Sequence, residues 1–229
     1  MADLEKMLRQ YAEGQTEVPR QRAPLEPRKR RYTLISVDDH VLEPPDTFTD
    51  RLPKRFGDRA PHIVRDDNGW DHWVIDNESF PLMGADAIIT WEPKDKYLGP
   101  VNFDQVRRGT WDIHARVVDM DLAGIAASLN FPSAPFGFAG QRFLRIKDEE
   151  LGLAAMRAYN DWVIESWAGA YPDRIIPCQV PWLSDPQIAA QEIERNAERG
   201  FKAVTFSENP EKLGLPSLYT GWWDPFFRA

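Results

Sequence analysis

Three side chains that can take part in chemistry follow one another at the end of a short β-prone run. The run is YTLISV, residues 32–37, and Asp38, Asp39 and His40 come directly after it. Residues two apart on an extended strand point to the same side, so we expect Asp38 and His40 to face a common position. A carboxylate oxygen and an imidazole nitrogen suit Zn²⁺, Mn²⁺ or Fe²⁺, and such an ion acidifies a bound water molecule or polarises a substrate oxygen. The alternative is an Asp-rich strand end that only caps a loop.

Glu208 is the third candidate ligand. It stands at the end of a second apolar run, VTFSEN, and a parallel barrel would place that end on the same face as Asp38 and His40. Asn209 is a rival for the inward position, but carboxylates bind hard or borderline cations better than amides do. The alternative for Glu208 is an exposed loop carboxylate near Pro210. The sequence therefore predicts a metal site made of Asp38, His40 and Glu208.

The other titratable side chains are weaker candidates. His62, His72 and His114 are each expected to be structural or surface residues. Glu43 either lines the mouth of the site beside the ligands or begins a turn. Cys178 is the single cysteine and lies in the apolar run IIPCQVPW, so we expect it to pack in the core and not to act as a nucleophile.

The elements that position these residues are predicted from hydrophobic period and turn residues. Residues 32–37 form a first core strand, and residues 61–76 form an inserted hairpin that turns at Asn68 and Gly69. Long loops are expected from there to about Thr110. Helix and strand then alternate, with helices at 113–123, 148–170 and 185–200 and core strands at 125–131, 175–182 and 201–207. A further helix is expected to start in WWDPFFRA at the end of the sequence.

This alternation is typical of a parallel-sheet α/β fold. We expect a partial (β/α)8 TIM barrel with an inserted β-hairpin and an N-terminal helical arm. Residues 1–31 would form that arm, a short amphipathic helix at 3–13 followed by a polar linker. Residues 32–229 would form the N-terminal portion of the barrel, truncated after about four of its eight core strands. A half-barrel exposes strand edges, so the expected partner is a second copy of the chain or a missing C-terminal half.

Composition limits the remaining choices. With 229 residues, of which 42% are hydrophobic, the chain can bury a core. Its net charge of -8 disfavours nucleic acid and anionic lipid as partners, and the basic stretch from Arg20 to Arg31 is expected to be a solvated linker. No apolar run approaches the roughly 20 residues that cross a bilayer, and the N-terminus lacks the order of a signal peptide. A cytoplasmic location is therefore predicted.

At ISVDDHVLEPPDTF the sequence resembles the amidohydrolase-related family, which includes aminocarboxymuconate semialdehyde decarboxylase and related metal-dependent hydrolases and decarboxylases. The similarity continues through ARVVDMDLAGIAASLNFPS, through YNDWVIESWAGAYPDRIIPCQVPWLSDPQIAAQEIERNAERGFKAVTF and through SENPEKLGLPSLYTGWWDPFF. It covers most of residues 33–227. The resemblance implies a barrel with one metal ion at its C-terminal mouth, in which the first strand supplies two ligands spaced two apart.

The chain departs from the family pattern at two positions. In much of the family the first pair is two histidines, whereas Asp38 stands at the first of these positions here. The next ligand, often histidine, falls at Glu208, and this exchange favours a harder ion such as Mn²⁺ over Zn²⁺. The family places a catalytic histidine and a proton-transferring aspartate on later strands, so no catalytic residue is assigned in this chain.

The resemblance implies a metal-dependent enzyme that hydrolyses an amide, ester or lactone, or that decarboxylates a small carboxylated substrate. The divalent ion would be Zn²⁺ or Mn²⁺, with Fe²⁺ as a further candidate, and the chain by itself is expected to be incomplete as a catalyst. The alternative is a non-catalytic remnant or assembly module of the same fold that binds no metal.

Overall fold

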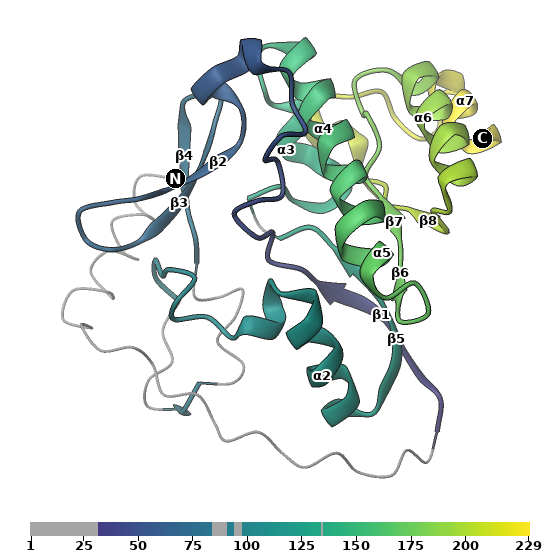
Figure 1. Ribbon diagram of the computed structural model, residues 1–229. Helices are drawn as coiled ribbons and strands as arrows, with labels where there is room; N and C mark the ends of the chain where they lie inside the picture. Colours follow the sequence, from purple (N-terminus) through teal and green to yellow (C-terminus); the bar gives the residue numbers. More distant parts are fainter. Residues whose placement is uncertain (1–31, 84–90, 94–97, 134) are drawn as a thin grey trace.

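The computed structural model describes residues 32–83, 91–93, 98–133 and 135–229. The helical arm and linker expected at residues 1–31 lie outside these residues. Figure 1 shows the described chain as parallel strands flanked by helices, with a separate small sheet attached. No helix in the described part of the chain combines the length and apolar character needed to cross a membrane.

Parallel strands form the core of the fold. One sheet has the order β1 (Leu34–His40), β5 (Ile125–Phe131) and β6 (Ile175–Ile176), and all of its pairs are parallel. A second parallel pair joins β7 (Cys178–Gln179) to β8 (Ala203–Val204). The predicted α/β class with a partial barrel is therefore confirmed, and within the described residues the strands do not close into a barrel.

The third and fourth core strands are shorter than the expected ranges 175–182 and 201–207. Pro177 separates β6 from β7 because proline has no N–H to give to the ladder. The pairing nevertheless continues past the interruption. Lys202 N–H donates to the carbonyl of Pro177 at 3.0 Å, and Thr205 N–H donates to the carbonyl of Gln179 at 3.0 Å.

An aspartate caps the start of each of the three longest helices, as was predicted for Asp185. Asp112, Asp148 and Asp185 accept hydrogen bonds from free amides of the first turn, which otherwise lack partners. Gly124 and Gly200 end two of these helices with φ of 76° and 109°, a conformation that suits glycine. The helices so bounded are α2 (Ile113–Ala123), α4 (Glu149–Trp162) and α6 (Pro186–Arg199).

The long helix predicted at 148–170 is confirmed with one irregularity. After α4 the chain continues as a π-helix at Val163–Trp167 and then as α5 (Ala168–Ala170). The helix expected in WWDPFFRA is α7 (Asp224–Arg228). Among the described residues, the other helices are α3 (Gln141–Leu144) and the 3-10 helices Lys54–Arg59, Arg108–Thr110, Phe138–Gly140, Pro210–Leu213 and Gly221–Trp223.

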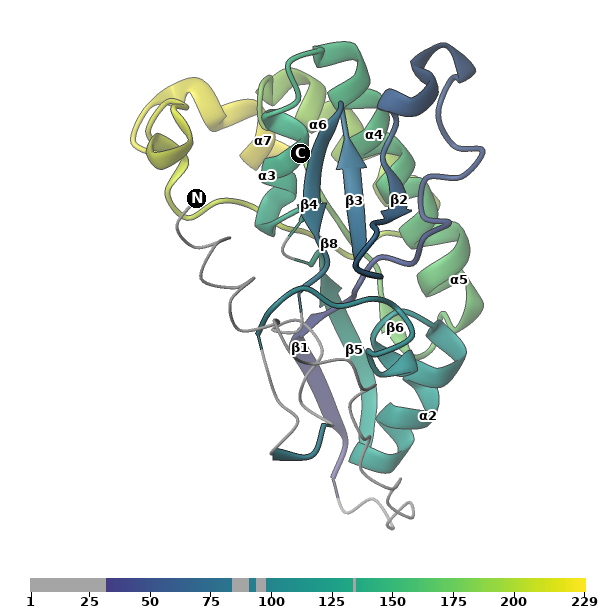
Figure 2. The same cartoon turned by 90° about the vertical axis from the view of Figure 1, so that its left-hand side faces the viewer.

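The inserted hairpin is confirmed and is larger than expected. Strands β2 (His62–Arg65) and β3 (Asp71–Ile75) pair antiparallel, and β4 (Glu78–Pro81) adds a third strand in a region where loops were predicted. Asp76 and Asn77 turn the chain between β3 and β4 with φ of 49° and 64°, and such turns match the twist of the strands that they join. Figures 1 and 2 show this small sheet beyond the ends of β1 and β5.

Strand β1 lies at the edge of the parallel sheet and is unusually exposed. Its only partner in the described part of the chain is β5. Leu34, Ile35 and Val37 are 52%, 50% and 64% exposed, although residues of this type are normally buried in parallel strands. The face of β1 that a closed barrel would bury is therefore open to solvent.

Candidate metal site

A β-bulge on β1 contains Asp38, the first predicted ligand, and ends just before His40, the second. Ser36 lies opposite Ser128 and Asp39 lies opposite Asn130, so β1 has one residue more than β5 over this interval. Bulges bend a strand and re-aim its side chains, and they are frequent beside functional sites. Asp38 Oδ1 and His40 Nε2 lie 4.0 Å apart, and the two side chains are 80% and 44% exposed. The structure thus brings Asp38 and His40 together, as the spacing predicted.

The ring of His40 is held in one orientation. Its Nδ1 lies 2.9 Å from the carbonyl oxygen of Pro132, and because a carbonyl only accepts, Nδ1 carries the proton. In the neutral ring, the lone pair of Nε2 then lies on the side of Asp38. Metal-bound histidines are commonly oriented through their second nitrogen in this way. Phe131 and Phe138 pack against the ring, with centroids at 6.0 and 5.0 Å.

The separation between Asp38 and His40 is compatible with a shared ion. Oxygen and nitrogen ligands lie about 2.0–2.2 Å from Zn²⁺, so two ligands of one ion lie at most about 4.4 Å apart, and about 3.4 Å apart at a tetrahedral angle. The observed 4.0 Å falls below the upper limit and corresponds to a ligand–metal–ligand angle wider than tetrahedral. The donor types and the orientation of His40 therefore fit a divalent cation at this pair.

Glu208 does not complete a ligand cluster in the described structure. It is exposed, and it lies in a segment beyond β8 that has no strand geometry, while its neighbour Ser207 is buried. Among the described residues, no group of three or more His, Cys, Asp or Glu side chains is placed to hold a metal ion. The three-residue set of Asp38, His40 and Glu208 therefore stays a prediction.

Glu43 is a buried carboxylate beside the segment that orients His40. It is fully buried, and it accepts hydrogen bonds from the N–H of Ser133, at 3.0 Å, and from the hydroxyl of Ser133. Ser133 directly follows Pro132, the acceptor of the His40 ring. Burial raises the pKa of Tyr159 well above its usual value, and the neighbouring charge of Glu43 adds to this effect. The structure thus places Glu43 in the interior, and a role for it beside the ligands stays a prediction.

Arg116 is a residue of the site that sequence reasoning missed. It projects from α2 and donates to the backbone carbonyl of His40. Burial lowers the pKa of its guanidinium, against the opposing effect of the nearby Asp39 and Asp119 charges. Its Cζ lies 5.9 Å from the ring centre of Trp167. No motif marks Arg116, because the contact joins α2 to a distant strand.

The remaining candidates have structural environments. Each of the other histidines contacts a polar neighbour, namely His62 with the carbonyl of Ala60 at 2.8 Å, His72 with Asp66 at 3.1 Å and His114 with the hydroxyl of Tyr171 at 2.9 Å. Cys178 is buried, and burial raises the pKa of its thiol to about 12. Because the thiolate is the nucleophilic form, this environment agrees with the predicted packing role of Cys178.

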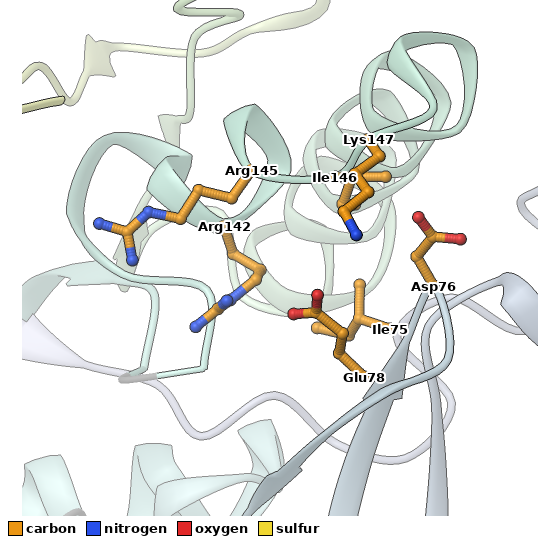
Figure 3. Close-up of a pocket in the computed structure, with 7 residues that line it drawn as sticks. All are labelled: Ile75, Asp76, Glu78, Arg142, Arg145, Ile146 and Lys147. Atoms are coloured by element: carbon orange, nitrogen blue, oxygen red, sulfur yellow. The ribbon is translucent and has the colours of Figure 1, made fainter. Parts of the chain in front are cut away.

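A separate pocket lies between the inserted sheet and α3, away from Asp38, His40 and Glu208. Figure 3 shows Asp76 and Glu78 of the inserted sheet on one side of it, while the Arg145 side chain extends away from them. Its lining consists of Ile75, Asp76, Glu78, Arg142, Arg145, Ile146 and Lys147. The Arg142 guanidinium stacks 3.8 Å from the ring centre of Phe80, and its Nε donates to the carbonyl of Pro135 at 3.0 Å. The contact with Phe80 of β4 attaches the inserted sheet to α3, so we assign the pocket a structural role.

Solved structures of similar fold were found by comparison. An amidohydrolase from Mycobacterium avium subsp. paratuberculosis K-10 is 24% identical, with a TM-score of 0.56 over 77% of this chain and 49% of that chain. A 5-carboxyvanillate decarboxylase from Novosphingobium aromaticivorans, complexed with manganese, is 19% identical, with a TM-score of 0.48 over 86% of this chain and 47% of that chain. A 2,6-dihydroxybenzoate decarboxylase from Rhizobium is 16% identical, with a TM-score of 0.44 over 86% and 46%.

The chain thus spans about half the length of the solved relatives that it matches. No curated protein matches it. The family model described as amidohydrolase matches residues 62–229, a range that includes Glu208 and begins after β1, so Asp38 and His40 precede it. Because this range takes in most of the sequence, the chain belongs to the amidohydrolase family.

Proposed function

We propose that this chain is the N-terminal portion of a metal-dependent enzyme in which Asp38 and His40 are ligands of a divalent cation. The enzyme would hydrolyse an amide, ester or lactone, or remove CO₂ from a small carboxylated substrate. The observation that carries the proposal is the oriented pair at the end of β1. His40 Nε2 lies 4.0 Å from Asp38 Oδ1, and its Nδ1 is committed to the carbonyl of Pro132.

The donor set supports Mn²⁺ or Zn²⁺, with Fe²⁺ as a further candidate. One carboxylate and one imidazole suit all three ions, and a second carboxylate from Glu208 would favour the harder Mn²⁺. When bound, such an ion lowers the pKa of water or polarises a substrate oxygen. The residues of this chain would bind the ion and fix its position, while Phe131 and Phe138 cover one side of the His40 ring.

The proposal includes completion of the barrel by further strands. The apolar side chains of β1 that face solvent are of the type that a closed barrel buries between neighbouring strands. The length covered in the solved relatives supports a C-terminal half as the source of these strands.

A titration with Mn²⁺ tests the metal proposal on the chain itself. The chain has four histidines, His40, His62, His72 and His114, and a paramagnetic ion broadens the NMR signals of nearby rings. Mn²⁺ is expected to broaden the His40 ring first, with the other three rings as internal controls. We expect Asp38→Asn to raise the Mn²⁺ concentration at half-broadening by about tenfold or more, since removal of one ligand weakens the site.

Asp67→Asn is the matched control, because Asp67 is an exposed aspartate in the turn between β2 and β3. It is expected to leave the titration unchanged. Glu208→Gln shows whether Glu208 belongs to the ligand set. Equal broadening of all four rings, or the same midpoint in Asp38→Asn and the unsubstituted chain, would favour the alternative of an assembly module that binds no metal.

A further inference from the structure

A chain of buried hydrogen bonds runs from the π-helix to β1. The indole N–H of Trp167 donates to Asn130 Oδ1 at 2.8 Å, and Asn130 Nδ2 donates to the hydroxyl of Ser128 at 2.8 Å. The Ser128 hydroxyl in turn donates to the carboxylate of Asp39. We call this series the Asp39 relay, made of Trp167, Asn130, Ser128 and Asp39. Its three donor residues are buried.

The donor and acceptor roles along the Asp39 relay determine which kind of group can accept its last hydrogen bond. Trp167 has only a donor, so Asn130 must accept through its oxygen and donate through its nitrogen. Ser128 accepts that nitrogen and therefore points its proton toward β1, where a carboxylate is the stronger acceptor. The relay thus selects a carboxylate on the face of the sheet to which Ser128 and Asn130 of β5 point.

Two consecutive aspartates make the register of β1 ambiguous. If β1 slipped by one residue, Asp38 would meet Ser128 and the side chains that follow would change faces. The bulge between Ser36 and Asp39 sets Asp39 opposite Asn130, where its carboxylate accepts from Ser128. Arg116 supports the same register, because it donates to the carbonyl of His40 while its positive charge lies near Asp39.

We propose that Asp39 is a positioning residue: the hydrogen bond that it accepts from Ser128 fixes the β1 bulge and thereby keeps Asp38 and His40 on the same side of β1. Asp39 itself is not a ligand in this arrangement. The proposal rests on the proposed function for its consequence, which is tighter metal binding. Its structural part, the fixed register of β1, has a readout without metal.

The first measurement is the Mn²⁺ titration of the His40 ring in relay variants. Ser128→Ala removes the hydroxyl that reaches Asp39, and Asp39→Asn removes the charge while keeping the shape. Loss of such outer partners costs roughly 10- to 100-fold in metal affinity, and we expect a shift of that size in both variants. Ser79→Ala is the matched control, because Ser79 lies on β4 and contacts His72, and it is expected to cause no shift.

The second measurement uses the metal-free chain. The amide of Val41 donates to the carbonyl of Phe131 at 3.0 Å, directly after the ligand pair. In Ser128→Ala we expect hydrogen exchange at the Val41 amide to become faster than in the unsubstituted chain. Exchange at the amide of Trp73 on β3, which lies in another sheet, should stay unchanged. Trp167→Phe acts at the far end of the relay and leaves Ser128 and Asp39 in place, so it serves if Ser128→Ala does not fold.

The results separate the two proposals. If Asp38→Asn weakens Mn²⁺ binding but Ser128→Ala, Asp39→Asn and Trp167→Phe do not, the positioning role is refuted and the metal site stands. If Asp38→Asn has no effect while Val41 exchange rises in the relay variants, the metal proposal fails and the register role stands. Uniform acceleration of exchange at Val41 and Trp73 would show only a general loss of stability and would overturn the positioning role.

Discussion

Replacement of Asn160 by alanine should destabilise the chain strongly, because this side chain forms hydrogen bonds with both polar backbone groups of Val180. Asn160 is fully buried in α4. Its Nδ2 donates to the carbonyl of Val180 at 2.9 Å, and its Oδ1 accepts from the N–H of Val180 at 2.9 Å. The pair of bonds ties α4 to the chain directly after β7, where the third core strand approaches the C-terminal side of the sheet.

The magnitude follows from the groups that Asn160→Ala leaves behind. Val180 is also buried, so its N–H and its carbonyl each lose a partner in a place that water does not reach. A buried donor or acceptor without its partner costs about 1–3 kcal/mol, so the two together cost about 2–6 kcal/mol. This is a large share of the roughly 5–15 kcal/mol that stabilises a typical domain.

Urea unfolding followed by tryptophan fluorescence measures this loss as a lower midpoint at an unchanged slope. Asn68→Ala is the matched control, because Asn68 is exposed in the turn before β3, and surface changes usually stay within about 0.5 kcal/mol. Asn160→Asp keeps the acceptor for Val180 N–H but sets a carboxylate beside the carbonyl, so it should also destabilise. A loss below about 1 kcal/mol in Asn160→Ala would refute the reasoning, since even one orphaned group costs that much.

Two further predictions concern titratable groups. Because burial raises the pKa of Cys178 to about 12, the native chain should not react with iodoacetamide at pH 8, whereas the urea-unfolded chain should gain one adduct by mass spectrometry; modification of the native chain at the unfolded rate would contradict the packing role. The amide of Leu151 and the guanidinium of Arg59 lower the pKa of Asp148 below its ordinary 3.8. Stabilisation by Asp148 is therefore present above about pH 4 and is lost as the pH falls through the lowered pKa. Asp148→Asn retains a capping side chain, so it should show a shallower loss of unfolding free energy between pH 5 and pH 2, and an unchanged pH profile would exclude this role.

Helix boundaries were predictable because their signals are local. Asp185 before Pro186 and Gly200 after Arg199 define α6 from neighbouring residues alone. The same holds for Gly124, whose positive φ ends α2. Capping and left-handed turns depend on residue type and not on distant contacts, so one sequence is sufficient to place them.

Strand details were less predictable because they depend on pairing. β4 was missed although Asp76 and Asn77 both tolerate positive φ, since a short run such as ESFP has no decisive period. The break at Pro177 was visible as a residue type, but its effect depended on the partner strand. In both cases the outcome is set by which backbone groups find a neighbour.

The candidate site divides in the same way. Spacing on one strand predicted that Asp38 and His40 share a side, and the structure places them 4.0 Å apart. The bulge, the relay to Trp167 and the contact of Arg116 join residues that are far apart in sequence, and no local pattern predicts them. The placement of Glu208 relative to the pair depends on strands and loops whose mutual arrangement the sequence does not encode locally.

The π-helix at Val163–Trp167 makes the length of its helix matter as much as its composition. A π turn holds one residue more than the α turn that would otherwise fill the same span. Deletion of one residue between Val163 and Trp167 would therefore leave an ordinary α turn over the same span, with the residues on both sides close to their present orientation. The same deletion in the regular part of α4 would instead rotate one side of the helix by about 100° relative to the other, and the indole of Trp167 would no longer face Asn130. The helix can thus change its length at the π turn with little effect on β1, whereas a change of length within α4 would reach β1 through Trp167.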